Sequence, residues 1–268
     1  MPEISSYETG KPCWADVTVP DVDAGAEFYS KLFGWMAEKA PQPEAGGYTM
    51  FSKGGKHVAA ASPPTPGQEG VPPHWTVYLA SDDADATAGK IRDAGGRVLM
   101  DPFDVFDSGR MTVAQDPTGA TFGVWQANQH IGAQLANEPG TQLWNQCHTP
   151  DPARATEFYV AAFGYEVDEI DLGGEQPFRV LNVNGRGIGG VREPVGGEPP
   201  HWSVTFAVAD ADETAARAKE LGGSVLMEPF DLPDIGRLAV LHDSAGAVFQ
   251  VMKSAGPPPE PPSYSSRP

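Results

Sequence analysis

Several features that mark secreted, membrane or metal-thiolate proteins are scarce in this sequence. It has only two cysteines, Cys13 and Cys147, in 268 residues, which is too few for a disulfide framework or a cysteine-based zinc site. No apolar run approaches the roughly 18 residues that a membrane-spanning helix needs. The first residues, MPEISSYETGKP, lack the basic start and apolar segment of a signal peptide. We therefore expect a cytoplasmic protein whose cysteines pack on strands.

Basic residues are scarce as well. The chain has 18 Lys and Arg against 36 Asp and Glu, a net charge of −18. Binding to nucleic acids and to anionic membranes depends on Lys and Arg, so we expect neither partner. The acidic surface favours solubility.

Two long segments of the chain repeat each other. The segment Gly95–Phe122, GGRVLMDPFDVFDSGRMTVAQDPTGATF, returns 127 residues later at Gly222–Phe249 as GGSVLMEPFDLPDIGRLAVLHDSAGAVF. PPHW occurs at 72–75 and again at 199–202, with the same spacing. The EFY…FG pattern at 27–34 returns at 157–164, 130 residues later, so a three-residue deletion separates the motifs. Such self-similarity indicates two copies of one domain of ordinary size.

Within each half, the pattern predicts a strand, a helix and three strands, twice over. In CWADVTV, residues 13–19, Val17 and Val19 share one face while Trp14, Asp16 and Thr18 share the other. Asp21 or Asp23 is expected to cap the helix that follows. We predict an α+β fold of four βαβββ modules in two tandem domains. The expected divisions are a loose arm 1–10, a first domain 11–126, a linker 127–140, a second domain 141–253 and a disordered Pro-rich tail 254–268.

This order of modules resembles the vicinal oxygen chelate superfamily, which contains glyoxalases, bleomycin resistance proteins and extradiol dioxygenases. The first-half carriers are VTVPDVDAGAEFYSKLFGW, DADATAGKIRDAGGRV and DPTGATFGVWQ. Their second copies are HTPDPARATEFYVAAFGY, DADETAARAKELGGSV and DSAGAVFQVMK. PPHW together with GATFGVWQ is most similar to a tandem actinobacterial branch described as glyoxalase-like or hydroxylase. The resemblance implies sheets curled into open troughs, with outer helices and the ligand on the concave face.

The resemblance also implies where a metal would bind. In metal-using members the ligands are usually His or Gln on the first strand, His or Glu on the first strand of the partner module, and Glu on the last strand. Aligned by the spacing from strand to Asp, these positions are Trp14, Thr76 and Gly123 in the first half, and Trp144, Ser203 and Gln250 in the second. Only Gln250 is a side chain of the family type.

A catalytic metal needs about three protein ligands and an open position. The best shifted set is His148, His201 and Gln250, but His148 lies four residues past the family position, about 13 Å along an extended strand. We therefore expect no cofactor, and a divalent Zn, Fe, Ni or Mn ion is the less favoured alternative.

Four residues are candidates for proton transfer: Asp16, His74, His148 and His201. A histidine with an ordinary pKa near 6.5 suits a general base, but His74 and His201 could equally hold the Pro-Pro loops before them. Asp16 could act as a general base or be a solvated carboxylate at the mouth of the trough. The candidates for substrate binding are Trp14, Thr76, Trp125, Trp144, Gln146, Ser203 and Gln250. Their tryptophans could hold a flat apolar ligand or plug the trough.

Two functions stay open. One is a glyoxalase-like lyase, isomerase or hydroxylase that acts without a metal on a small oxygenated organic molecule. The other is a metal-free binding or sequestration protein for an aromatic natural product. In either case a single trough could be the working one, with the other half as scaffold. Because four modules in one chain can satisfy their pairings internally, we expect a monomer or a weak homodimer.

Overall fold

The computed structural model describes residues 3–65, 70–171, 177–194 and 196–256, so most of the tail that we expect to be disordered lies outside it. The first half contains β1 (Pro12–Thr18), α1 (Val22–Phe33), β2 (Met36–Lys39), a 3-10 turn η1 (Pro43–Ala45), β3 (Thr49–Lys53), β4 (Lys56–Ser62), β5 (His74–Ala80), α2 (Ala84–Asp93), β6 (Arg97–Val105), β7 (Gly109–Gln115) and β8 (Thr121–Ala127). The second half contains β9 (Gln142–His148), α3 (Pro152–Phe163), β10 (Glu166–Ile170), β11 (Phe178–Val183), β12 (Arg186–Arg192), β13 (His201–Ala207), α4 (Ala211–Glu220), β14 (Ser224–Leu232), β15 (Gly236–His242) and β16 (Val248–Ser254).

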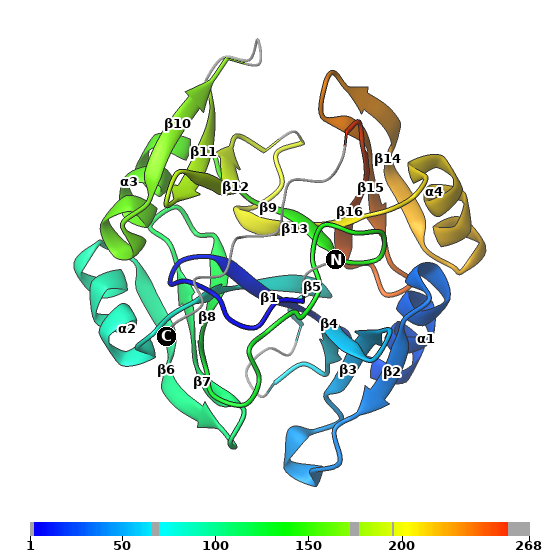
Figure 1. Cartoon of the computed structure of the whole chain (residues 1–268), viewed down its shortest axis with the longest axis horizontal. Helices are drawn as coiled ribbons and strands as arrows, with labels where there is room; N and C mark the ends of the chain where they lie inside the picture. Colours follow the sequence, from blue (N-terminus) through cyan, green and yellow to red (C-terminus); the bar gives the residue numbers. More distant parts are fainter. Residues whose placement is uncertain (1–2, 66–69, 172–176, 195, 257–268) are drawn as a thin grey trace.

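Each half forms one eight-stranded mixed sheet. The strand orders are β2-β3-β4-β1-β5-β8-β7-β6 and β10-β11-β12-β9-β13-β16-β15-β14. Two modules join in the middle of each sheet, where β1 runs antiparallel to β5 and β9 to β13. Figure 1 shows the two sheets curling away from each other. The predicted α+β fold with four βαβββ modules in two tandem domains is confirmed.

Every α-helix begins at an aspartate that the sequence places just before it. These N-caps are Asp21, Asp83, Asp151 and Asp210. The Oδ1 atom of Asp21 accepts a hydrogen bond of 3.0 Å from the backbone N–H of Ala24, one of the donors that a helix start leaves without a partner. Helices α1 and α3 end at Gly34 and Gly164 with φ of 73° and 75°, where glycine is favoured.

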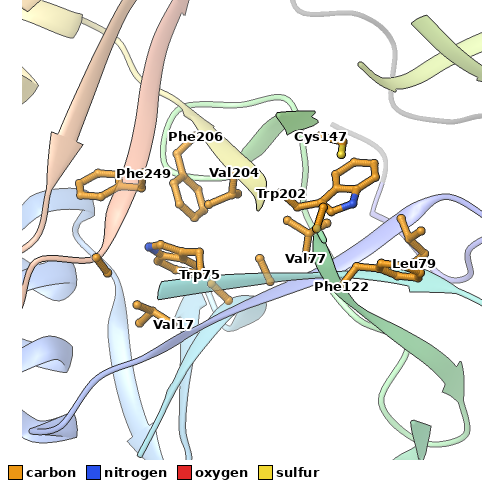
Figure 2. Packing of buried hydrophobic residues seen from close by; sticks show 14 of the residues in the cluster. Val17, Trp75, Val77, Leu79, Phe122, Cys147, Trp202, Val204, Phe206 and Phe249 are labelled. Atoms are coloured by element: carbon orange, nitrogen blue, oxygen red, sulfur yellow. The ribbon is translucent and has the colours of Figure 1, made fainter. Parts of the chain in front are cut away.

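The two sheets share a single hydrophobic core. Strand β5 contacts β13, and the helices lie at the two sides in pairs drawn from different domains, α1 beside α4 and α2 beside α3 (Figure 1). The ring of Trp75 lies 5.1 Å from that of Phe206 in the other domain. Figure 2 shows this core, in which Val17 lies on the face that the alternation predicts. Burying one large apolar side chain contributes about 1.5–3 kcal/mol, so this common core fixes how the domains sit together.

The opposite face of each sheet carries the residues of interest for function. We call the face with Trp14, Asp16, Tyr78 and Trp125 the first trough. The face with Trp144, Gln146, Thr205 and Gln250 is called the second trough. Side chains two residues apart on a strand lie on the same face. Successive side chains of each central strand therefore point alternately into the core and into the trough.

The N-terminal arm and the interdomain linker are held against the first domain, although the sequence suggests a loose arm. Ile4 is buried, and its N–H donates to the carbonyl oxygen of Gln134 at 3.0 Å. The linker N–H of Ala133 donates to Cys13 O at 2.8 Å, and that of Gln134 to His57 O at 2.8 Å. These backbone bonds place the linker across the starts of β1 and β4.

Both cysteines are buried free thiols, as the sequence predicts. Among the described residues, no helix is long and apolar enough to cross a membrane.

Candidate functional site

The floor of the first trough is built from facing residues of β1 and β5. Trp14 lies opposite Tyr78, and Asp16 lies opposite Thr76. Tyr78 in turn pairs with Gly123 of β8. A β-bulge between Pro12 and Trp14 shifts the register of β1 against β5. That shift lies before Trp14, so the row at the family's metal position follows the regular pairing and is Trp14, Tyr78 and Gly123, with Tyr78 in place of the Thr76 that spacing suggests.

Asp16 is a buried carboxylate held by two phenols. Its Oδ2 atom accepts hydrogen bonds from the hydroxyls of Tyr78, at 3.0 Å, and Tyr48, at 3.1 Å. Its other oxygen, Oδ1, receives no hydrogen bond from a described residue. This oxygen also keeps some contact with solvent. Only 5% of the residue is exposed. Asp16 therefore keeps one oxygen open to whatever enters the trough.

Burial decides the charge state of this carboxyl. Loss of hydration raises the pKa of Asp16 to about 7, against the opposing effect of the hydrogen bonds from Tyr78 and Tyr48. Burial and the nearby Asp16 raise the pKa of both tyrosines well above the usual value, so they stay protonated and can only donate to Asp16. A carboxyl with such a pKa can both take up and release a proton near neutral pH.

Aromatic rings and the linker pack around Trp14, which is linked to this carboxylate through Tyr48. The indole N–H of Trp14 donates to the Tyr48 hydroxyl at 3.0 Å, which links Trp14 to Asp16 through one phenol. The indole N–H of Trp125 donates to the carbonyl oxygen of His130 at 2.8 Å. The imidazole of His130 meets the Trp14 ring edge-on, with 4.5 Å between centroids. Trp14 and Trp125 are both buried, so they form much of the wall and fill part of the trough.

The second trough has different chemistry at equivalent positions. Trp144 lies opposite Thr205, and Thr205 pairs with Gln250. The Thr205 hydroxyl donates to the Gln250 side-chain oxygen at 2.9 Å. Gln146 stands where the first trough has Asp16. This trough therefore lacks the carboxylate and holds amides and hydroxyls instead.

Two histidines stack beside this row. His148 lies opposite His201, and their rings are parallel with centroids 4.7 Å apart. The Nε2 atom of His148 lies 3.0 Å from the Gln146 amide nitrogen and 3.0 Å from the Ser203 hydroxyl. Because the amide N–H donates, Nε2 accepts and the proton of the neutral ring sits on Nδ1, which is buried and bonds to none of the residues that the structure describes. Burial, with the charges of His201 and Arg192, lowers the pKa of His148 to about 3, so this ring is neutral near pH 7.

The structure brings some of the predicted site residues together and leaves others apart. His148, His201, Gln146 and Ser203 form one cluster, and Thr205 joins Trp144 to Gln250. His74 lies opposite Thr18, two residues before the Thr76 that faces Asp16. The Nδ1 atoms of His74 and His201 bond to the carbonyl oxygens of Pro72 and Pro199, at 2.9 and 3.0 Å. Both histidines thus hold the Pro-Pro loops, the structural alternative that the sequence leaves open.

Three residues of the first trough are not found by reasoning from the sequence: Tyr48, Tyr78 and His130. Tyr78 carried a signal, because it lies two residues after Thr76 and so shares its face. Tyr48 and His130 reach the trough only through the folding of a distant hairpin and of the linker, for which no local pattern exists.

Two family profiles match this chain, one in each domain. The profile of the Glyoxalase/Bleomycin resistance protein/Dioxygenase superfamily matches residues 12–124, and that of the Glyoxalase-like domain matches residues 145–252. The chain is 47% identical over 258 residues to "Putative glyoxylase CFP32" of Mycobacterium tuberculosis, covering 95% of this chain and 99% of that protein. The chain belongs to the glyoxalase/bleomycin resistance/dioxygenase superfamily. It is also 42% identical to "Anthracycline biosynthesis protein DnrV" of Streptomyces peucetius, covering 93% of this chain and 95% of that one.

Solved structures of the superfamily share the fold at low identity. A Mn(II)-bound glyoxalase from Novosphingobium aromaticivorans superposes with a TM-score of 0.65 at 17% identity, covering 91% of this chain and 82% of its own. The 2,3-dioxygenase LapB from Pseudomonas sp. KL28 superposes with a TM-score of 0.66 at 12% identity, covering 95% and 96%.

The residues at the superfamily's ligand positions do not fit a metal ion. In the first domain these positions hold the indole of Trp14, the phenol of Tyr78 and Gly123, which has no side chain. A β-carbon on Gly123 would lie 2.1 Å from the ring of Tyr78, so that ring fills the space from which a glutamate would reach an ion. In the second domain only the neutral oxygens of Thr205 and Gln250 are present, and they bond to each other. Among the described residues, no three His, Cys, Asp or Glu side chains gather as a metal would require.

Proposed function

We propose that the protein is an enzyme that moves a proton on a small oxygenated organic molecule bound in the first trough, with Asp16 as the acid–base group. The observation that carries the proposal is the buried Asp16 carboxyl, whose pKa is raised to about 7 and whose Oδ1 atom accepts no hydrogen bond from a described residue. General acid–base groups work best when their pKa lies near the working pH.

The proposed step is a proton transfer of the isomerase or lyase type. Ionised Asp16 takes a proton through Oδ1 from a carbon next to a substrate carbonyl, and the electron pair of that C–H bond becomes the enolate. The hydroxyls of Tyr48 and Tyr78 stay on Oδ2, which keeps Oδ1 directed at the substrate. Protonated Asp16 then returns the proton to another atom of the same substrate, which completes an isomerisation, or to a leaving group, which completes an elimination.

The surroundings of Asp16 favour a flat, partly aromatic substrate. Tyr48 bonds to the carboxylate and Trp14 bonds to Tyr48, and Trp125, Met50 and Met111 pack in the same apolar cluster as Trp14. Aromatic walls with a few polar groups suit oxygenated ring systems. The names of the relatives, a glyoxylase and an anthracycline biosynthesis protein, agree with small carbonyl compounds and with polycyclic aromatic ketones. We propose that the reaction runs without a metal, because the ligand positions hold the wrong donors.

A second candidate function is binding without turnover. It is favoured by the close filling of the first trough, where Trp14, Tyr78 and Trp125 are each less than a tenth exposed. In that case the neutral His148 beside His201, whose proton sits on Nδ1, would donate a hydrogen bond in the second trough, and the protein would sequester an aromatic natural product.

Turnover assays separate the two functions. Methylglyoxal–thiol adducts, catechols and polycyclic aromatic ketones are each incubated with the protein, with and without added divalent ions. For any compound converted, Asp16→Asn should lower kcat by about 100-fold or more, while the matched variant Asp93→Asn, at an exposed helix end, should leave it unchanged. Full activity of Asp16→Asn would refute the assignment. Tight binding with no conversion of any class would favour the binding protein.

A further inference from the structure

A cavity that is separate from the Asp16 carboxylate lies where the two domains meet. The N-terminal arm, the linker, and the starts of β9 and β12 line this cavity of about 120 Å³. Its lining includes Ile4 and Tyr7 of the arm, Lys11, Gln142, Asn145 and Arg186. Residues from both domains are therefore needed to form it.

Two carboxamides in this lining have no hydrogen bond. Gln142 is 7% exposed and Asn145 is 5% exposed. Neither side chain bonds to any described residue, and Gln142 Nε2 and Asn145 Oδ1 are also sealed from solvent. A buried polar group without a partner costs free energy, and a 180° turn of either amide only exchanges which atom faces the cavity. In each amide the sealed atom is out of reach, so a ligand in the cavity can bond only to the other polar atom of Gln142 and of Asn145, and a turn of the amide decides whether that atom is the donor or the acceptor.

The charges around the cavity favour an anion. Lys11 is only 4% exposed and forms an ion pair with Glu8. Arg186 is exposed on the rim, where its charge acts on Glu8, and its guanidinium makes no hydrogen bond or ion pair with a described residue. Two cations against one carboxylate leave an excess of one positive charge here, in a chain whose net charge is −18.

We propose that this cavity is a binding site for a small monocarboxylate, held by the carboxamides of Gln142 and Asn145 and by the guanidinium of Arg186. An apolar cavity of about 150 Å³ holds benzene, so this one suits a ligand of roughly four to six non-hydrogen atoms. Amide N–H groups and an arginine fork are suitable donors for carboxylate oxygens. A hydroxyl or keto group next to the carboxylate would satisfy the second amide, so short hydroxy- and ketocarboxylates are the expected class.

Titration of the full-length protein with lactate, pyruvate and glycolate tests this proposal. In ¹H–¹⁵N NMR spectra, the side-chain amide signals of Gln142 and Asn145 should shift and saturate with these acids. The neutral isostere lactamide should produce no saturable shift. Arg186→Gln should weaken the binding by about 10-fold or more, as expected for the loss of a charge-assisted hydrogen bond.

The control is Arg154→Gln, which removes the same charge from an exposed position on α3 and should leave the affinity unchanged. Asn145→Leu should abolish binding. Because that buried variant could fail to fold, the rim variant Arg186→Gln provides the decisive comparison. The proposal is overturned if no acid gives saturable shifts, if lactamide binds equally well, or if the shifts map to the residues around Asp16 or His148 instead.

Discussion

The hydroxyl of Tyr29, on the first helix of the first domain, donates a hydrogen bond of 2.9 Å to the carboxylate of Asp243 in the second domain. The same hydroxyl accepts from the indole N–H of Trp75, also at 2.9 Å. The equivalent hydrogen bond in the opposite direction runs from the hydroxyl of Tyr159 in the second domain to the carboxylate of Asp116 in the first, at 3.0 Å. The repeated PPHW, EFY and Asp-containing turn motifs therefore meet across the domain interface. Their recurrence has a structural cause, because these residues hydrogen-bond to one another across the interface.

Removing one of these hydroxyls should destabilise the whole molecule. Tyr29→Phe leaves the buried Asp243 carboxylate and the Trp75 N–H without this partner, at a cost of about 1–3 kcal/mol. Tyr159→Phe should cost a similar amount. Because the two networks are separate, their effects should add in the double variant. Urea denaturation of the three variants measures this, and changes below about 0.5 kcal/mol would show that the hydroxyls do not hold the domains together.

The raised pKa of Asp16 should make stability depend on pH in a defined direction. The folded pKa of about 7 exceeds the ordinary value of 3.8, so the folded state holds its proton more tightly than the unfolded state. The resulting stability is fully present below about pH 4 and is lost as the pH rises through about 7, on the order of 4 kcal/mol in all.

Asp16→Asn should abolish that loss, so the variant should gain stability relative to the wild type between about pH 5 and pH 8. Urea denaturation across this range gives the comparison, and Asp93→Asn serves as the matched control. A wild type and an Asp16→Asn variant with parallel pH profiles would contradict the raised pKa.

Gly123 should accept a side chain only if Tyr78 becomes smaller. Gly123→Gln places a β-carbon against the Tyr78 ring, and overpacking of this kind typically costs about 1–3 kcal/mol. The double variant Tyr78→Thr with Gly123→Gln copies the Thr205–Gln250 pair of the second trough and should recover part of that loss. Thermal unfolding tests the coupling. Gly89→Ala is the control, because its β-carbon meets open space. Equal stability of the single and double variants would argue against steric exclusion at this row.

His148 should remain neutral over most of the accessible pH range. Its folded pKa of about 3 lies below the ordinary 6.5, so its contribution to stability is present above about pH 6.5 and is lost as the pH falls towards 3. The imidazole signals of His148 in an NMR titration should not move between about pH 8 and pH 5. A midpoint near 6.5 would show that the ring is hydrated and that the second trough is more open than described.

Purified protein should hold no tightly bound metal at the superfamily's ligand rows. Because Trp14, Tyr78 and Gly123 offer no suitable donors, elemental analysis should find Zn, Fe, Ni and Mn well below one ion per domain. Close to one ion per domain, retained through dialysis against a chelator, would contradict this expectation.

The local sequence determined most of the architecture. The repeat spacing indicates two domains, the alternation of Val17 with Trp14 and Asp16 assigns the faces of β1, and the aspartates at 21 and 23 mark the start of α1, where Asp21 is the cap. These features follow from interactions between residues close in sequence, such as capping and side-chain periodicity, so they can be derived without coordinates.

Only the tertiary structure decided what the troughs contain. Alternation assigns a face but not the partner across the sheet, and the pairing of β1 with β5 puts Tyr78, not Thr76, opposite Trp14. The phenol of Tyr48 reaches Asp16 from another strand, and the linker brings His130 against Trp14. The charge of Asp16 near neutral pH depends on burial by these distant groups, and desolvation is a property of the assembled fold.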